Sequence, residues 1–296
     1  MYKLLLFLSI YLLSFQLSGQ NILQRDLVKS CFLKFDNKSS GTGCIYQDTL
    51  GTYLVTARHN LYEAKGKKFM RKANNCELTA FPRDVTKSST NSLQLNLATL
   101  EKLGLIKYDE KNDIAVVKLG NINRVNDSLS FINYIIPHVR KLSKSSRLQG
   151  FFNDETEIFS KLELGNDIFV IGFPNAIGLK NYPQYDFNKP LLRRGIIAGK
   201  SDKFRTFVID AHIYGGNSGG PVIKYTKNFE VKELPNGNIG FIDIEKTKLI
   251  GIVSQFIPFQ EIWENKNYNI KNIEWDNSGY GVIVPIDYAL KLIEEF

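Results

Sequence analysis

Residues Gly215–Val222 read Gly-Gly-Asn-Ser-Gly-Gly-Pro-Val and form the strongest local pattern in this sequence. Glycines on both sides of Ser218 permit a tight backbone turn that directs N–H groups at one point. A serine hydroxyl is a weak nucleophile that needs a base, and the oxyanion formed by its attack needs such donors. The stretch therefore predicts a nucleophile at Ser218, with the N–H groups of Gly216 and Ser218 as the oxyanion hole. An ordinary glycine-rich loop is the alternative.

The base that activates this serine should be a histidine, because imidazole titrates near neutral pH. His59 directly follows the apolar segment Tyr53–Thr56, so a rigid strand would deliver it. His138 falls in a polar, irregular stretch, and His212 stands six residues before Ser218. His59 is therefore the predicted base, although a histidine at a strand end is also an ordinary structural feature.

A carboxylate is needed to hold the imidazole in one tautomer and to stabilise the imidazolium. Asp113 directly precedes the apolar run Ile114–Leu119, where a simple turn residue is the alternative. The order His59, Asp113, Ser218 is that of the chymotrypsin-type triad and differs from the orders in subtilisin and the α/β-hydrolases. This order, with each residue at a strand edge, favours catalysis over three separate structural roles.

The rest of the chain predicts an all-β fold. Short apolar segments alternate with turn residues, and Pro235-Asn236-Gly237 is a hairpin turn signal. Convincing helical spacing of apolar residues occurs only in Ile286–Phe296. Many short strands and one terminal helix indicate a barrel or sandwich architecture. Predicted strands include Leu27–Phe35, Tyr53–Thr56, Ile114–Leu119, Asp167–Gly172, Gly195–Ala198, Phe207–Asp210, Pro221–Tyr225, Leu249–Ser254 and Gly281–Val284.

Taken together, the motifs resemble those of the trypsin/chymotrypsin-like serine endopeptidases, specifically the compact bacterial form found in the HtrA/Deg proteases. The resemblance covers roughly residues 25–295. It implies two six-stranded-type β-barrels with a C-terminal helix and an active site between the barrels. It also implies a peptide-bond hydrolase that works through an acyl-enzyme intermediate and needs no cofactor. The matching segments are Ser39–Ile45, Thr56–His59, Asn112–Ala115, Gly172–Pro174, Arg194–Ile197, Gly216–Pro221 and Gly281–Pro285.

The same resemblance suggests supporting residues. Ser254 matches a serine that supports the catalytic aspartate, and Gln255 and Phe256 would pair with substrate backbone as an added strand. His212 falls at the floor of the primary specificity pocket, with Gly281 on a wall. Either His212 contacts a polar or acidic substrate side chain, or it points away from an apolar pocket.

Several features depart from the family pattern. The sequence after the terminal helix leaves no room for the PDZ module of the Deg proteases. Residues 226–247 and 257–278 are long for the loops expected at those places, where they would shape a restricted cleft or a partner site. The alternative function is a catalytically silent trypsin-like fold that acts as a binding module. The presence of all triad residues and oxyanion glycines favours an enzyme over that alternative.

The N-terminus predicts export. Residues 1–19 contain one lysine, an apolar run and small residues at Ser18 and Gly19, as in a signal peptide. The run is too short to favour a transmembrane helix. We therefore expect a periplasmic or extracellular protein with no stable membrane insertion after the signal is removed.

Within the exported chain, residues 20–296 are expected to form the peptidase domain. We expect an N-terminal barrel at about 22–125, a connector at about 126–160, a C-terminal barrel at about 161–285 and a terminal helix at 286–296.

Composition narrows the partners and the bound groups. The net charge is +8, but basic residues are scattered among acidic ones, so we expect a polypeptide substrate and no nucleic acid. The sequence has three cysteines and no Cys-x-x-Cys pair, so no metal site is expected. Cys31 and Cys44 fall in neighbouring predicted strands and could form a disulfide; three buried free thiols with Cys76 are the alternative. The oligomeric state stays open.

Overall fold

The computed structural model describes residues 25–81, 90–125, 128–143, 148–174, 186, 189–233, 239–265, 268 and 270–296. The signal peptide predicted for residues 1–19 lies outside this part of the chain. None of the helices in the described part is long and apolar enough to cross a membrane.

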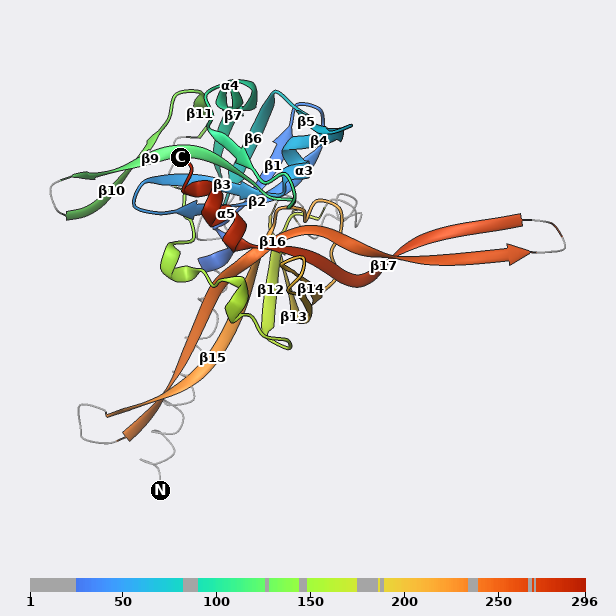
Figure 1. Cartoon of the computed structure of the whole chain (residues 1–296). Helices are drawn as coiled ribbons and strands as arrows, with labels where there is room; N and C mark the ends of the chain where they lie inside the picture. The colour runs from blue at the N-terminus through green and yellow to red at the C-terminus, as the bar shows by residue number, and fades with distance from the viewer. Residues whose placement is uncertain are drawn as a thin grey trace.

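The first half of the chain forms a nine-stranded sheet with the order β10-β9-β3-β2-β1-β6-β7-β11, in which β8 also pairs with β9 (Figure 1). Neighbouring strands are antiparallel. A separate two-stranded sheet joins β4 and β5. The strands are β1 Ser30–Phe35, β2 Ser40–Gln47, β3 Gly51–Thr56, β4 Tyr62–Lys65, β5 Lys68–Arg71, β6 Asn75–Ala80, β7 Asn91–Asn96, β8 Ile106–Tyr108, β9 Ala115–Val125, β10 Ser128–Ile135 and β11 Val139–Lys141.

The second half forms a closed barrel with the strand order β12-β13-β14-β17-β16-β15. Short helices lie between the strands, and α5 (Ile286–Ile293) ends the chain. The predicted all-β class with two barrel-like halves and a C-terminal helix is therefore confirmed. The remaining elements are α3 Arg58–Leu61, α4 Leu97–Lys102, η1 Asn153–Glu155, η2 Phe159–Lys161, β12 Asp167–Gly172, β13 Leu191–Ser201, β14 Thr206–Asp210, β15 Pro221–Glu233, β16 Ile239–Asn265 and β17 Ile270–Pro285.

Two strands lie where an irregular connector was expected, within residues 126–160. β10 pairs with the end of β9, and β11 pairs with β7, so both belong to the first sheet. Each is an edge strand at one end of that sheet. Backbone pairing to a single neighbour holds such a strand, so it does not need the continuous apolar run of a buried strand.

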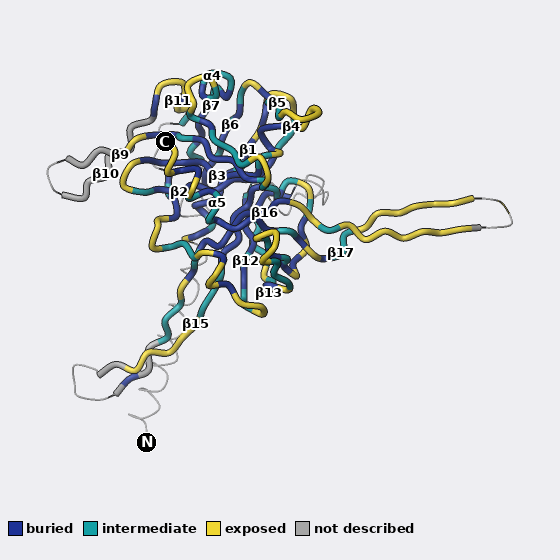
Figure 2. The backbone as a smooth tube through the Cα atoms, viewed as in Figure 1, coloured by how far each residue is buried: buried dark blue, intermediate teal, exposed yellow. Residues whose placement is uncertain are grey.

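The described residues of the segments expected as long loops, 226–247 and 257–278, form antiparallel ribbons. β15 and β16 pair from Pro221–Ile252 out to Glu233–Ile239, and β16 and β17 pair from Gly251–Pro285 out to Asn265–Ile270. Figure 1 shows both ribbons projecting from the body, and Figure 2 shows that the second is exposed along most of its length. We call residues 226–247 the β15–β16 arm and residues 258–277 the β16–β17 arm. Val231 stands between the polar residues Glu230 and Lys232 in the first arm, as in an alternating strand, whereas Ile262 and Trp263 are adjacent in the second arm.

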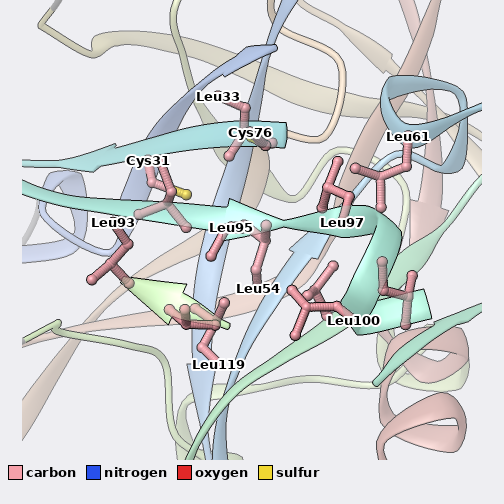
Figure 3. Close-up of a cluster of buried hydrophobic side chains, with 14 of the residues drawn as sticks. Cys31, Leu33, Leu54, Leu61, Cys76, Leu93, Leu95, Leu97, Leu100 and Leu119 are labelled. Carbon is pink, nitrogen blue, oxygen red and sulfur yellow. The ribbon is translucent and has the colours of Figure 1, made fainter. Parts of the chain in front are cut away.

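Buried aliphatic side chains hold each half together. The core of the first sheet packs Cys31, Leu33, Leu54, Leu93 and Leu95 among other leucines (Figure 3). A second cluster joins the halves, because it combines Val55 and Val116 of the first sheet with Ile223 and Ile252 of the barrel and with α5. A third cluster fills the barrel.

Of the two alternatives for the cysteines, the structure has the three free thiols: Cys31 and Cys44 form no disulfide, and all three cysteines are buried. Cys31 pairs across the strands with Gly43, while Cys44 faces Ser30. Side chains of successive strand residues point to opposite faces of a sheet. The two sulfurs therefore lie in different clusters, Cys31 in the core of the first sheet and Cys44 between the halves. Burial raises the pKa of Cys44 to about 12.

Replacing Leu54 by alanine tests the core of the first sheet. Leu54 is fully buried, so Leu54→Ala should lower the free energy of unfolding by about 2–5 kcal/mol through lost burial and a residual cavity. Urea unfolding followed by circular dichroism measures the change. Leu50→Ala is the matched control, because Leu50 is 68% exposed and should change stability by less than about 0.5 kcal/mol. Equal losses in the two variants would contradict this account of the core.

Candidate active site

His59 and Asp113 lie in direct contact at the edge of the first sheet. His59 belongs to the single turn α3, which begins directly after β3, and Asp113 stands just before β9. Nδ1 of His59 lies 2.6 Å from Oδ2 of Asp113, and the backbone N–H of His59 donates to Oδ1 at 2.9 Å. One carboxylate thus contacts both the ring and the backbone of the histidine. Since Nδ1 is engaged, Nε2 is the ring nitrogen left to accept a proton.

A hydroxyl from the second half completes the surroundings of Asp113. Ser254, in β16, donates from Oγ to Oδ2 of Asp113 at 2.7 Å. Burial acts to raise the pKa of Asp113, but the hydrogen bond and charge of His59 and the hydroxyl of Ser254 outweigh it and hold the pKa below its ordinary value. The carboxylate is therefore ionised at neutral pH.

Ser218 lies in the loop between β14 and β15, opposite this pair. Its Oγ donates to the backbone carbonyl of Ser254 at 3.3 Å. Within the described chain, no hydrogen bond joins Ser218 Oγ to His59. Catalytic hydrogen bonds are often long or misaligned before substrate binds, so this geometry is compatible with a nucleophile and its base.

The turn around Ser218 leaves two N–H groups free. Gly216 has φ 96° and Gly219 has φ 82°, and both values lie in the left-handed region that favours glycine. A side chain at Gly219 would also collide with the carbonyl oxygen of Thr42. No described residue accepts a hydrogen bond from the N–H of Gly216 or of Ser218. These are the two groups that the sequence predicts as the oxyanion hole.

Two residues that the sequence analysis missed hold the turn from the other half. The N–H of Thr42, in β2, donates to the carbonyl of Ser218 at 3.0 Å, and Nδ2 of Asn60 donates to the same oxygen at 2.8 Å. The Thr42 hydroxyl donates to the carbonyl of Gly216 at 2.6 Å. Thr42 and Asn60 are thus positioning residues for the loop that carries Ser218.

Thr56 ties these two residues together. Its hydroxyl donates to the carbonyl of Thr42 at 2.7 Å, and Nδ2 of Asn60 donates to that hydroxyl at 2.9 Å. Two sequence features could have indicated these residues. Thr42 stands between Gly41 and Gly43, and Asn60 directly follows the predicted base His59.

The residues predicted for the specificity pocket, His212 and Gly281, contact their own neighbours in the second half. His212 is exposed and stacks on Tyr214 with 6.3 Å between ring centroids, and its ring lies beside Gly279. Gly281 packs against Ile213 rather than against His212. Among the described residues, no hydrogen bond joins His212 to Ser218.

A positive side chain borders this region. Arg193 donates from Nη1 to the carbonyl of His212 at 2.8 Å, and its guanidinium lies 4.5 Å from the centre of the Tyr214 ring. Gln255 and Phe256 are exposed on β16, immediately after Ser254.

The Asn217 side chain, next to Ser218, is buried, and its Oδ1 has no hydrogen-bond partner in the described structure.

A surface cavity of about 540 Å³ lies away from these residues, between the ends of β2 and α5. It is lined by Asp48, Asp154 and Glu294 among others, and by none of the predicted site residues.

Comparison with protein families gives one match. A model of the trypsin-like peptidase domain matches residues 41–229. No curated protein matches the chain.

Among solved structures, similar folds are found at low identity. A form of the HtrA-type protease AlgW with a tripeptide is 16% identical, with a TM-score of 0.50; the alignment covers 94% of this chain and 63% of that chain. Deg5 is 15% identical, with a TM-score of 0.47; the alignment covers 92% of this chain and 90% of that chain. The protease Anisep from Arthrobacter nicotinovorans is 13% identical, with a TM-score of 0.44; the alignment covers 90% of this chain and 93% of that chain. At such identities the similarity concerns the fold alone.

Replacing Asp113 by asparagine tests the electrostatics of the site. The folded-state pKa of Asp113 lies below its unfolded value of about 3.9, so ionisation stabilises the fold above that pH, and the stabilisation is lost as pH falls through the folded-state pKa. The stability difference between wild type and Asp113→Asn should therefore shrink as pH falls below about 5 in urea unfolding. The exposed carboxylate variant Asp202→Asn is the control and should show no such trend. A constant difference for Asp113→Asn would contradict the lowered pKa.

Proposed function

The chain belongs to the trypsin-like peptidase family, and on this basis we propose that it is a serine endopeptidase with His59, Asp113 and Ser218 as its triad. The observation that carries the proposal is the double contact of the Asp113 carboxylate with the ring and backbone of His59. A turn residue would need neither contact. The hydrogen bond from Ser254 adds a third contact to the same carboxylate.

In the proposed reaction, Ser218 Oγ attacks the carbonyl carbon of the scissile peptide bond while Nε2 of His59 takes the hydroxyl proton. The carbonyl oxygen becomes an oxyanion, which accepts hydrogen bonds from the N–H groups of Gly216 and Ser218. His59 then gives its proton to the leaving amine as the C–N bond breaks. An ester between Ser218 and the upstream half of the substrate remains.

Water completes the cycle by the same route. His59 takes a proton from water, the resulting hydroxide attacks the ester carbonyl, and Ser218 regains its proton from His59 as the acid product leaves. Asp113 stays ionised throughout and stabilises the imidazolium that forms in both stages, because its pKa is held low. Each step is a proton transfer or an acyl transfer that these three side chains can perform.

Substrate binding would use the strand that carries Ser254. Its backbone carbonyl lies beside Ser218 Oγ, so it can accept an N–H from the residue whose carbonyl is attacked. Gln255 and Phe256 would continue this pairing, with Gly281 at the pocket wall. Arg193 beside His212 supports the version in which the pocket contacts a polar or acidic side chain. A clear preference for lysine or arginine in a peptide library would reject both this version and the apolar pocket.

One observation favours the alternative of a silent binding module. Ser218 Oγ donates to the Ser254 carbonyl, and no hydrogen bond to His59 is present in the described chain. A fluorophosphonate probe separates the two functions, because it labels only an activated serine.

We also propose that the chain is exported after cleavage behind Gly19, and that its barrels divide near the expected connector at 126–160. The apolar run in residues 1–19 supports export. N-terminal sequencing of the mature protein tests the cleavage site.

Replacing Ser218 by alanine should remove nearly all peptidase activity and leave the melting temperature almost unchanged, because the hydroxyl acts in the transition state. His59→Ala should cost about as much, since triad residues act as a unit. Ser201→Ala, at the end of β13, is the control and should keep full activity. Retention of about a tenth of wild-type turnover in Ser218→Ala would show that the nucleophile is another residue.

We further predict that no activating cleavage is needed. Digestive relatives carry an aspartate before the nucleophile that pairs with a newly freed terminal amine, whereas this chain has the neutral Asn217. Residues 20–296, expressed and checked for intact mass, should react with the fluorophosphonate probe at once. Labelling that begins only after a cut between about residues 20 and 30 would overturn this inference.

A further inference from the structure

The strand that borders the nucleophile continues out of the body as one side of the β16–β17 arm. Along Pro258–Asn265, β16 pairs only with β17, so in the described chain its other edge has no partner strand. At Ser254 the same unpaired edge faces Ser218 Oγ through the backbone carbonyl. An open strand edge presents N–H and C=O groups that can pair with another extended chain.

The base of the arm is fixed to the wall of the active-site region. Ser278 Oγ donates to the carbonyl of Ile257 at 2.5 Å, and the Asn277 side chain donates to the carbonyl of Ile213. The Gly279 carbonyl accepts the N–H of Ala211 at 2.9 Å. The arm is therefore held in one position relative to the loop that contains His212 and leads to Ser218.

The arm carries large apolar side chains that its own fold leaves exposed. Trp263 is 61% exposed and Trp275 is 65% exposed. Figure 2 shows this arm as exposed along most of its length. Exposed apolar side chains that gather on one element indicate an interaction site, whereas apolar residues scattered singly over a surface need no such explanation. The other members are Phe259, Ile262, Ile270 and Ile273.

The cross-strand register sorts these side chains onto two unlike faces. Residues directly opposite in an antiparallel pair share a face. Ile262 lies opposite Ile273, and Trp275 lies opposite Gln260. The charges on this face, Glu264 and Lys271, lie opposite each other and form an ion pair, so they balance; we call it the apolar face. The other face combines aromatic and acidic residues: Phe259, Glu261, Trp263, Glu274 and Asp276.

The acidic face has an internal cost. Glu261 and Glu274 lie directly opposite each other, an arrangement of like charges that destabilises a strand pair. In the described chain neither carboxylate has a Lys or Arg within ion-pair distance, whereas Glu264 on the apolar face pairs with Lys271 at 3.3 Å. A cationic side chain between the two carboxylates would relieve the repulsion, and Trp263 beside them could contact it through its ring.

We propose that the β16–β17 arm is a docking strand for the part of a polypeptide substrate that precedes the scissile bond. For an added strand antiparallel to β16, residues before the scissile bond lie beside Gln255 and Phe256 and then beside the arm. At about 3.3 Å per residue the contact reaches about ten residues upstream. The fitting segment alternates basic residues, which meet the acidic face, with apolar residues, which meet the face of Ile262 and Trp275.

The composition of the arm argues against a lipid surface as the occupant. Its face of Glu261, Glu274 and Asp276 would be repelled by anionic headgroups. The β15–β16 arm also exposes Phe229 and Val231. It is formed by the part of β16 that precedes Ser254, whereas the β16–β17 arm is formed by the part that follows Ser254. The β15–β16 arm serves as an internal control for loss of exposed apolar surface.

The inference rests on the proposed peptidase, so its first test compares substrates of two lengths. A short substrate ends about three residues before the scissile bond, and a long one adds about seven alternating basic and apolar residues. For wild type, kcat/KM should be at least about tenfold higher for the long substrate, mainly through KM. Glu261→Lys combined with Glu274→Lys should remove this advantage and leave the short substrate within about twofold.

Phe229→Ser is the matched control for Phe259→Ser, because both rings are exposed on an arm. We expect Phe259→Ser to reduce the advantage of the long substrate and Phe229→Ser to keep it. No length advantage in wild type, or an advantage that survives the double charge reversal, would overturn the proposal. A change of oligomeric state in the arm variants, seen by sedimentation, would also overturn it by assigning the arm to a second copy of the chain.

A binding test separates failure of this inference from failure of the proposed activity. The chain contains two tryptophans, and both lie on the β16–β17 arm, so intrinsic tryptophan fluorescence reports on the arm alone. The long peptide should shift the emission of Ser218→Ala to shorter wavelength, and the short peptide should not. This result is expected whether or not wild type cleaves peptides. An unchanged emission at a saturating concentration of the long peptide would reject the docking strand.

Discussion

The carbonyl oxygen of Ser218 is the point on which the site depends. It accepts hydrogen bonds from the N–H of Thr42 and from the amide of Asn60, both in the first half of the chain, while Ser218 itself belongs to the second. The turn can point its N–H groups outward only while its carbonyls are occupied from behind. A buried carbonyl without a partner costs about 1–3 kcal/mol, so separation of the halves would penalise this turn directly.

Apolar packing between the two halves surrounds that polar contact and stabilises their association. The cluster between the halves includes Val55 and Ile252 as well as residues of α5. Ser254 and Asp113 make the second polar link, which brings a barrel hydroxyl to a carboxylate of the first sheet. Docking of the halves therefore adds the hydroxyl of Ser254 to a carboxylate that His59 already contacts, and it holds the turn around Ser218 in place.

The residues predicted for the site are those whose sequence signals are local. His59, Asp113 and Ser218 each lie in a short motif at a strand edge, so their types and spacing could be interpreted before the fold was known. Thr42 and Asn60 were missed because their contacts are long-range: Asn60 and Ser218 are 158 positions apart. The arms were missed for a different reason, since polar residues on two-stranded ribbons resemble loops. The sequence also could not show that Cys31 and Cys44 lie on opposite faces of the sheet, because this depends on how β1 and β2 are paired.

One consequence follows from the length of β16. This single strand has 27 residues, and it runs from one arm, through the barrel wall beside Ser218, into the other arm (Figure 1). At about 3.3 Å per residue its backbone is about 90 Å long. Its pairing with β17 is irregular between Val253 and Pro258, in the segment next to Ser218. A mechanical load applied between the two arms would pass along one backbone and through this irregular segment, so pulling on either arm would act on the carbonyl that accepts the Ser218 hydroxyl.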